Sequence, residues 1–159
     1  MILVAHSDTV YLNETRACSR VGLHIFCSDH YPIPRDSGPI LYLAQIINVV
    51  MPSASEAELA RLLFTATAMI PLRHTLKEMK LPQPRSPIQT DNSTANGFSN
   101  QTIVTKKTKS MDVRFYWLRC RDSQSQFRYY WSPGTTNRAD YHTKRHPPQY
   151  QEAHIPWAS

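Results

Sequence analysis

Short β-type hydrophobic runs open this chain, and a helical pattern follows them. Residues 2–11 combine Ile, Val and Tyr, residues 21–27 alternate loosely between apolar and polar, and residues 40–51 form the longest apolar run. The link between the first two runs is short and polar, and the next link is rich in proline. We therefore predict three strands that pair antiparallel in succession, a meander that needs a helix to cover one face.

The strongest helix signal begins at Ser53. Ser53 with Glu56, and Ser55 with Glu58, each have the spacing of a capping box, and Leu, Ala and Ile then recur at a 3.6-residue period. Pro71 falls within this pattern. We expect a kink or break there, because proline lacks a backbone N–H and clashes with the preceding turn.

The second half of the chain alternates strand and helix signals. A β-type run ends in Asp91, and Asn92 or Ser93 is a good N-cap for a short helix after it. The pattern then favours another helix, a strand and a final short helix, at residues 111–118, 126–132 and 137–140. The predicted order is strand, strand, strand, helix, strand, helix, helix, strand, helix.

Composition narrows the class of protein. A hydrophobic content of 41% is typical of a folded domain. No apolar run approaches the roughly 20 residues of a membrane span, and no signal-peptide pattern opens the chain, so we expect a soluble intracellular protein. We predict one domain over residues 1–146 and a disordered tail over 147–159. The net charge of +6 favours polyanionic partners, and the three cysteines lack zinc-site spacing.

A few of the 12 acidic residues occupy positions where a carboxylate is unexpected, such as the interior of an apolar strand or the end of a strand. Asp8 interrupts an apolar strand, where burial is costly unless the acid is paired, hydrogen-bonded or bound to a cation. Asp91 ends a strand, and ligands and catalytic groups collect at such ends in open α/β sheets. Asp140 opens the last helix. Glu56 and Glu58 are each explained as helix-capping acids when taken singly.

Five groups of residues occur in an order that is specific when taken together. They are His6-Ser7-Asp8 with Tyr11-Leu12 and Ser19-Arg20, then Ser53 to Leu59, Gln89 to Ala95, Lys107 to Phe115, and Pro133-Gly134 with Asn137, Ala139-Asp140 and Thr143-Lys144. This set, covering residues 3–148, resembles the ribonuclease H region of a copia-type LTR retrotransposon Pol polyprotein. The resemblance implies an α/β (α+β) ribonuclease H-like fold, with a five-stranded mixed sheet of three antiparallel and then parallel strands, and helices on both faces.

The resemblance also implies an activity, the hydrolysis of the RNA strand of RNA/DNA hybrids with two Mg²⁺ ions, for which Mn²⁺ can substitute. Asp8 would bridge both ions, Glu58 and Asp91 would hold one, and Asp140 would hold the other. Paired hard cations need several carboxylate oxygens around them, which agrees with these residue types. Glu58 is preferred as the catalytic glutamate because a hydrophobic residue follows it, and Glu56 stays open as the alternative.

Two groups of polar residues are candidates for binding nucleic acid. The first group, for the backbone or a 2′-hydroxyl, is Asn92, Ser93 and Asn137, with polar capping as the alternative. The second group, a basic ridge that recurs every seven residues, is Lys107, Arg114 and Arg121, with a solvated helix face as the alternative. The expected partners are an RNA/DNA hybrid and the reverse transcriptase domain of the same polyprotein, in a cytoplasmic retroelement particle or in the nucleus and without a membrane.

Departures from the family pattern keep a second reading open, a catalytically inactive remnant that binds nucleic acid. Pro71 interrupts the helix, and Arg61 stands near the catalytic glutamate where small or apolar side chains are usual. The turn at residues 132–134 lacks the histidine that cellular ribonucleases H carry there. An integrase or transposase core on the same fold would need an acidic triad ending in Glu and often a His/Cys zinc module, and the sequence shows neither.

Overall fold

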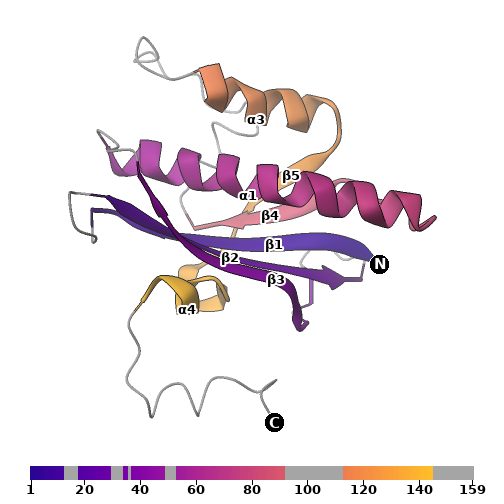
Figure 1. The fold of residues 1–159 in the computed structure, drawn as a ribbon, viewed down its shortest axis with the longest axis horizontal. Helices are drawn as coiled ribbons and strands as arrows, with labels where there is room; N and C mark the ends of the chain where they lie inside the picture. The colour runs from indigo at the N-terminus through magenta and orange to yellow at the C-terminus, as the bar shows by residue number, and fades with distance from the viewer. Residues whose placement is uncertain (13–17, 30–33, 36, 49–52, 92–112, 145–159) are drawn as a thin grey trace.

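A mixed β-sheet forms the centre of the molecule. The computed structural model describes residues 1–12, 18–29, 34–35, 37–48, 53–91 and 113–144. The strand order is β3-β2-β1-β4-β5 (Figure 1). The strands are β1 (Ile2–Val10), β2 (Ser19–Ser28), β3 (Pro39–Ile47), β4 (Ser86–Thr90) and β5 (Phe127–Trp131). The helices are α1 (Ala54–Glu78), α3 (Val113–Ser123), the 3₁₀ turn η3 (Gly134–Thr136) and α4 (Asp140–Thr143).

The pairing of the strands confirms the predicted five-stranded mixed sheet. β1 pairs antiparallel with β2, and β2 pairs antiparallel with β3. β1 then pairs parallel with β4, and β4 pairs parallel with β5. Because β1 and β4 run in the same direction, their C-terminal ends lie at the same edge of the sheet. This edge receives Asp8 and Asp91, and we call it the acidic rim.

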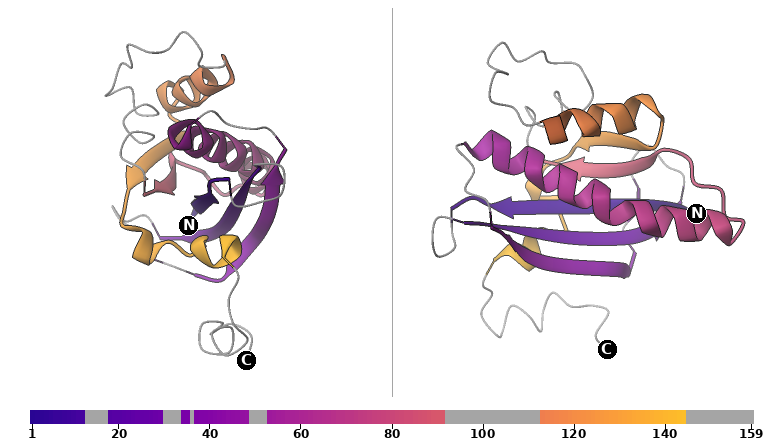
Figure 2. Two further views of the ribbon diagram at one scale, coloured as in Figure 1. Left: turned by 90° about the vertical axis from the view of Figure 1, so that its left-hand side faces the viewer. Right: turned by 45° about the horizontal axis from the view of Figure 1, so that its top comes forward.

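Helices cover both faces of the sheet, as predicted. α1 and α3 lie on one face and the short α4 lies on the other (Figures 1 and 2). Successive residues of a strand point to opposite faces, so Leu3 and Ala5 of β1 pack in the core with Leu62 and Met69 of α1. Burying each such large side chain stabilises the fold by about 1.5–3 kcal/mol. Asp8 faces the other side, toward α4.

The prediction that α1 kinks or breaks at Pro71 is wrong. The helix runs for 25 residues without interruption, and Pro71 lies inside it. Pro71 has no N–H, so one backbone carbonyl on the preceding turn of α1 receives no helical hydrogen bond. The side chain of Pro71 is exposed, and this carbonyl therefore lies on the solvent side of the helix. Ala66 and Met69 are fully buried against the sheet, and this packing outweighs one missing hydrogen bond.

The other boundaries differ modestly from the predictions. β3 ends at Ile47, earlier than the predicted residue 51, and it is an edge strand with Tyr42 63% exposed. Leu118 is buried in α3, as predicted. The predicted helix after Asp91 and the predicted tail at 147–159 lie outside the described residues. No helix in the described part of the chain is long and apolar enough to cross a bilayer.

A glycine in β2 allows α4 to approach the sheet. A Cβ atom on Gly22 would lie 2.8 Å from the carbonyl oxygen of Ala139 and 2.9 Å from Cγ2 of Thr143. Distances below 3 Å require the neighbouring atoms to move, and one of these neighbours is backbone. The position of α4, and with it the position of Asp140, therefore depends on the absence of a side chain at residue 22.

We expect Gly22→Ala to destabilise the fold by about 1–3 kcal/mol, because the added methyl group overpacks the contact between β2 and α4. Urea denaturation followed by circular dichroism measures this change. The matched control is Gly38→Ala, because a Cβ atom there meets nothing within 4 Å. An unfolding midpoint for Gly22→Ala equal to that of the control would contradict the packing argument.

Candidate active site

A buried arginine joins three of the four predicted acids. Arg61 follows Glu58 by one turn of α1, and its side chain is fully buried. Nη2 of Arg61 lies 2.5 Å from Oε2 of Glu58, and Nη1 lies 3.2 Å from Oδ1 of Asp91 and 4.0 Å from Oδ1 of Asp8. Carboxylates from β1, from α1 and from the end of β4 therefore converge on one guanidinium group at the acidic rim.

Neutral oxygens of the sheet also hold this guanidinium. Nη1 of Arg61 donates a hydrogen bond of 2.8 Å to the carbonyl oxygen of Ser7, and Nη2 donates one of 2.7 Å to Oγ1 of Thr90. A guanidinium stays charged in any protein environment, so its burial requires partners of this kind. Arg61 is thus tied to β1, to β4 and to its own helix.

The fourth acid lies on the α4 side of Asp8. Asp140 is the first residue of α4, and Thr143 of the same helix donates a hydrogen bond to Oδ2 of Asp8. Nζ of Lys144 lies 2.7 Å from Oδ1 of Asp140. The negative charge of Asp140 helps to raise the pKa of Asp8, so these two carboxylates interact. All four predicted acids therefore belong to one electrostatic centre.

Burial shifts the titration of two of these acids upward. Loss of hydration raises the pKa of Glu58 from its ordinary 4.5 to about 7; Arg61 opposes this rise, and the charges of Asp91 and Asp8 add to it. Burial also raises the pKa of Asp8, while the Thr143 hydrogen bond and Arg61 lower it. Among the described residues, the carboxylates of the centre outnumber the one buried cation that contacts them, Arg61.

The four carboxylates are the type of ligand that divalent cations require, because Mg²⁺ and Mn²⁺ prefer carboxylate oxygens. Oε2 of Glu58 is buried and accepts no hydrogen bond. It lies close to Nη2 of Arg61, and this contact is an ion pair without hydrogen-bond geometry. Within the described ranges, however, no three His, Cys, Asp or Glu side chains gather closely enough to hold a metal ion. The guanidinium lies between the acids, and a divalent ion 4 Å from it would be repelled by about 8 kcal/mol at an effective dielectric constant near 20.

The two candidate glutamates have different surroundings. Glu58 contacts the buried guanidinium, whereas the backbone N–H of Glu56 donates to Oγ of Ser53, which is the N-cap of α1. The geometry therefore favours Glu58 over Glu56 as the glutamate of the centre.

The predicted nucleic-acid contacts are only partly described. Asn137 is buried; its Nδ2 donates to the carbonyl oxygen of Ser7 at 2.7 Å, and its Oδ1 accepts from the backbone of Ala139. Asn137 therefore has a structural role, since its side chain holds the backbone of β1 and of the segment before α4, although the N-cap of α4 is Ala139. The guanidinium of Arg121 stacks over Trp117 at 4.5 Å. Asn92, Ser93, Lys107 and the side chain of Arg114 lie outside the described residues.

The sequence prediction missed the central role of Arg61. Its position three residues after Glu58 was a usable signal, because residues at that spacing lie on the same face of a helix. Thr143 was also missed as a partner of Asp8. No local pattern could have indicated this contact, because Thr143 and Asp8 are 135 positions apart in the chain.

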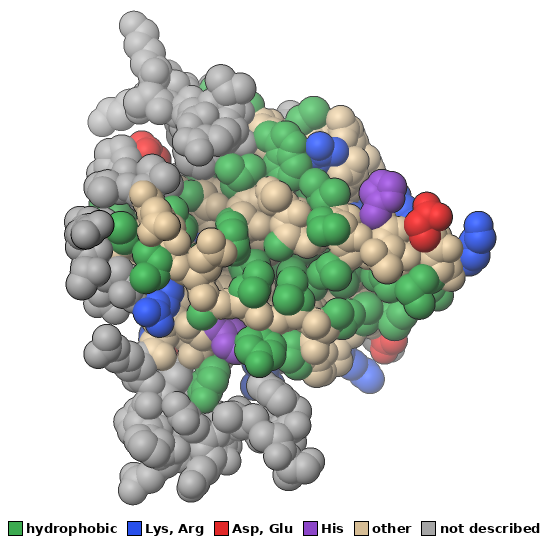
Figure 3. All heavy atoms as spheres, in the orientation of Figure 1, with side chains coloured by type: hydrophobic (Ala, Val, Ile, Leu, Met, Phe, Trp, Pro, Cys, Tyr) green, Lys and Arg blue, Asp and Glu red, His purple; other side chains and the backbone are tan. Residues whose placement is uncertain are grey.

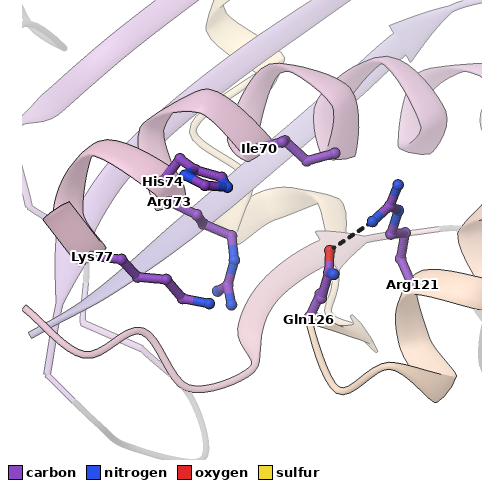
Figure 4. A pocket seen from close by; sticks show the side chains of 6 residues that line it. All are labelled: Ile70, Arg73, His74, Lys77, Arg121 and Gln126. Carbon is purple, nitrogen blue, oxygen red and sulfur yellow. Dashed lines mark hydrogen bonds between the residues drawn. The ribbon is translucent and has the colours of Figure 1, made fainter.

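A cationic pocket lies at the other end of α1. Figure 3 shows charged side chains gathered where this helix ends. Figure 4 shows the pocket, of about 150 Å³, between the last turns of α1, the end of α3 and the start of β5. Its lining residues are Ile70, Arg73, His74, Lys77, Arg121 and Gln126. Arg73 donates to the carbonyl oxygens of Pro84 and Gln83, and Arg121 donates to Gln126, so both arginines have a role in holding the fold.

Comparison with solved structures identifies the fold. The N-terminal ribonuclease H domain of a Mycobacterium tuberculosis protein superposes with a TM-score of 0.62, at 16% identity and 89% coverage of each chain. A ribonuclease H1 isolated from compost, solved in complex with an RNA/DNA hybrid, gives 0.60 at 14% identity, covering 87% of this chain and 91% of that one. The ribonuclease H1 of Halobacterium salinarum gives 0.56 at 15% identity, with 89% and 93% covered. The predicted ribonuclease H fold is confirmed.

Comparison of sequences finds a retrotransposon polyprotein among the curated proteins. The chain is 29% identical over 92 residues to the retrovirus-related Pol polyprotein from transposon TNT 1-94 of Nicotiana tabacum. The match covers 58% of this chain and 7% of that polyprotein. No family model matches the chain. The predicted resemblance to a retrotransposon Pol polyprotein is confirmed.

The raised pKa of Glu58 predicts a pH effect on stability. An acid with a pKa of 4.5 when unfolded and about 7 when folded contributes most to stability below pH 4.5, and that contribution is lost as the pH rises to 7. The loss is on the order of 3 kcal/mol. We therefore expect Glu58→Gln to gain stability relative to the original chain between pH 4.5 and pH 7. Urea unfolding in metal-free buffer at several pH values measures this.

Glu56→Gln is the matched control for this effect, because it removes a carboxylate from the same turn without touching the centre. Parallel curves of stability against pH for Glu58→Gln and the original chain would contradict the prediction.

Proposed function

We propose that this chain is a ribonuclease H-type endonuclease domain that hydrolyses the RNA strand of RNA/DNA hybrids. The observation that carries the proposal is the gathering of Asp8, Glu58 and Asp91 around Arg61 at the rim where β1 and β4 end, with Asp140 near enough for its charge to raise the pKa of Asp8. The ribonuclease H fold supports it, and so does the compost ribonuclease H1 that was solved with a hybrid bound.

The four acids are the groups that would hold divalent ions, either Mg²⁺ or Mn²⁺. Such ions would supply activation of the attacking water and stabilisation of the leaving 3′ oxygen. The protein itself positions the carboxylates. Thr143 holds one oxygen of Asp8, and helix α1 brings Glu58 over the ends of the strands. The high pKa of Glu58 makes its ionisation dependent on a nearby positive charge.

The partners follow from the same proposal. The net charge of +6 attracts a polyanionic hybrid. We assign phosphate or 2′-hydroxyl contacts to Asn92, Ser93, Lys107 and Arg114. Because the relative is a Pol polyprotein, we also propose that a reverse transcriptase domain of the same polyprotein works with this domain, in a cytoplasmic retroelement particle or in the nucleus.

Arg61 favours a second candidate function, the binding of hybrids without cleavage. A cation that permanently contacts Asp8, Glu58 and Asp91 competes with divalent ions for the same oxygens. In that case, the domain would hold a hybrid and leave both strands intact. Cleavage assays together with binding assays separate the two candidates.

We expect the purified chain to cut the RNA strand of a fluorescently labelled hybrid in Mn²⁺ or Mg²⁺ and not in EDTA. Asp8→Asn, Glu58→Gln and Asp91→Asn should each lower the rate by about 100-fold or more, since even the loss of groups supporting a metal ligand costs about 10–100-fold. Denaturing gel electrophoresis of the labelled RNA gives the rate.

Glu56→Gln and Glu78→Gln serve as controls that remove a carboxylate elsewhere on α1, and both should cut like the original chain. Cleavage that persists in Asp8→Asn and Asp91→Asn would refute the assignment of the active site. If the original chain binds the hybrid in fluorescence anisotropy and cuts nothing with either metal, the second candidate function holds.

A further inference from the structure

The contacts of Arg61 divide the four acids into two sets. The guanidinium touches Asp8, Glu58 and Asp91, and these three are the carboxylates that would share one of the two ions. Asp140 is paired with Lys144 at the surface, and its side chain is 36% exposed. The negative charge of Asp140 raises the pKa of Asp8, and Thr143 of the same helix donates a hydrogen bond to Asp8.

The guanidinium is anchored independently of the acids. Its hydrogen bonds to the Ser7 carbonyl oxygen and to Oγ1 of Thr90 would remain if every carboxylate turned toward a metal ion. The side chain is fully buried and cannot lose its charge. A positive charge is therefore a permanent part of the acidic rim.

We propose that Arg61 takes the place of the divalent ion that Asp8, Glu58 and Asp91 would share, so that this centre binds at most one ion. Arg61 supplies the positive charge that Asp8, Glu58 and Asp91 require, and it excludes a cation from the same oxygens. This inference rests on the proposed function, because it concerns the metal sites of that activity. Arg61 acts here as a positioning residue, through the carboxylates that it holds.

Counting bound Mn²⁺ tests the inference without measuring activity. Electron paramagnetic resonance of free Mn²⁺ during a titration gives the number of ions bound per chain. We expect the original chain to bind one ion or none. Arg61→Ala should bind one additional ion, because the repelling charge is gone, and its affinity for that ion should be at least about tenfold higher than any second-site affinity of the original chain. Arg61→Lys keeps the charge and should behave like the original chain.

Removing the buried cation also makes folding depend on metal. Arg61→Ala leaves three crowded carboxylates, so Mn²⁺ should raise its thermal midpoint much more than that of the original chain or of Arg61→Lys. Arg61→Met, which keeps the length of the side chain without its charge, repeats the test if Arg61→Ala does not fold. Asp91→Asn in the Arg61→Met background should abolish the additional ion.

Two ions bound to the original chain would overturn the inference. If the original chain bound two ions and also cut hybrids, the proposed function would hold and this further inference would not. Equal Mn²⁺ binding by the original chain, Arg61→Ala and Arg61→Met would overturn it as well. Hybrid cleavage by the original chain with one ion bound would support both the inference and the proposed function. One bound ion without cleavage would support the inference and leave hybrid binding as the function.

Discussion

The pairing of one buried guanidinium with three carboxylates is the interaction on which the acidic rim depends. Without Arg61, the carboxylates of Asp8 and Glu58 would lie largely shielded from water beside the partly exposed Asp91, and their mutual repulsion would add to the cost of burial. With Arg61, the three strand and helix ends that carry them can meet. The same charge that makes this arrangement stable restricts what other cations the rim can accept.

Helix and sheet packing bring this centre together. α1 lies across the sheet on Leu3, Ala5 and their neighbours, and its second turn reaches the rim where β1 and β4 end. On the opposite face, α4 approaches β2 closely because Gly22 has no side chain, and this places Thr143 against Asp8. The centre is therefore built from both faces of the sheet, with Asp8 as the residue common to both.

This construction separates the fold from the chemistry. The strand order and the two helical layers are those of the ribonuclease H fold, which this chain shares with solved structures at 14–16% sequence identity. Which cations the rim accepts depends on charges within a few ångströms of one another, so one side chain such as Arg61 in the second turn of α1 affects cation binding without affecting the fold.

The sequence by itself determined where the five strands and helix α1 form, and the family resemblance pointed to the four acids. Period-two and period-3.6 patterns locate strands and helices because local geometry decides which side chains share a face. Local patterns could not predict that α1 continues through Pro71, because packing of the whole helix on the sheet decides that. Nor could they show that Arg61 points into the acids rather than to solvent. Only the tertiary structure decided this, since the partners of Arg61, Ser7 and Thr90 among them, come from strands far apart in the chain.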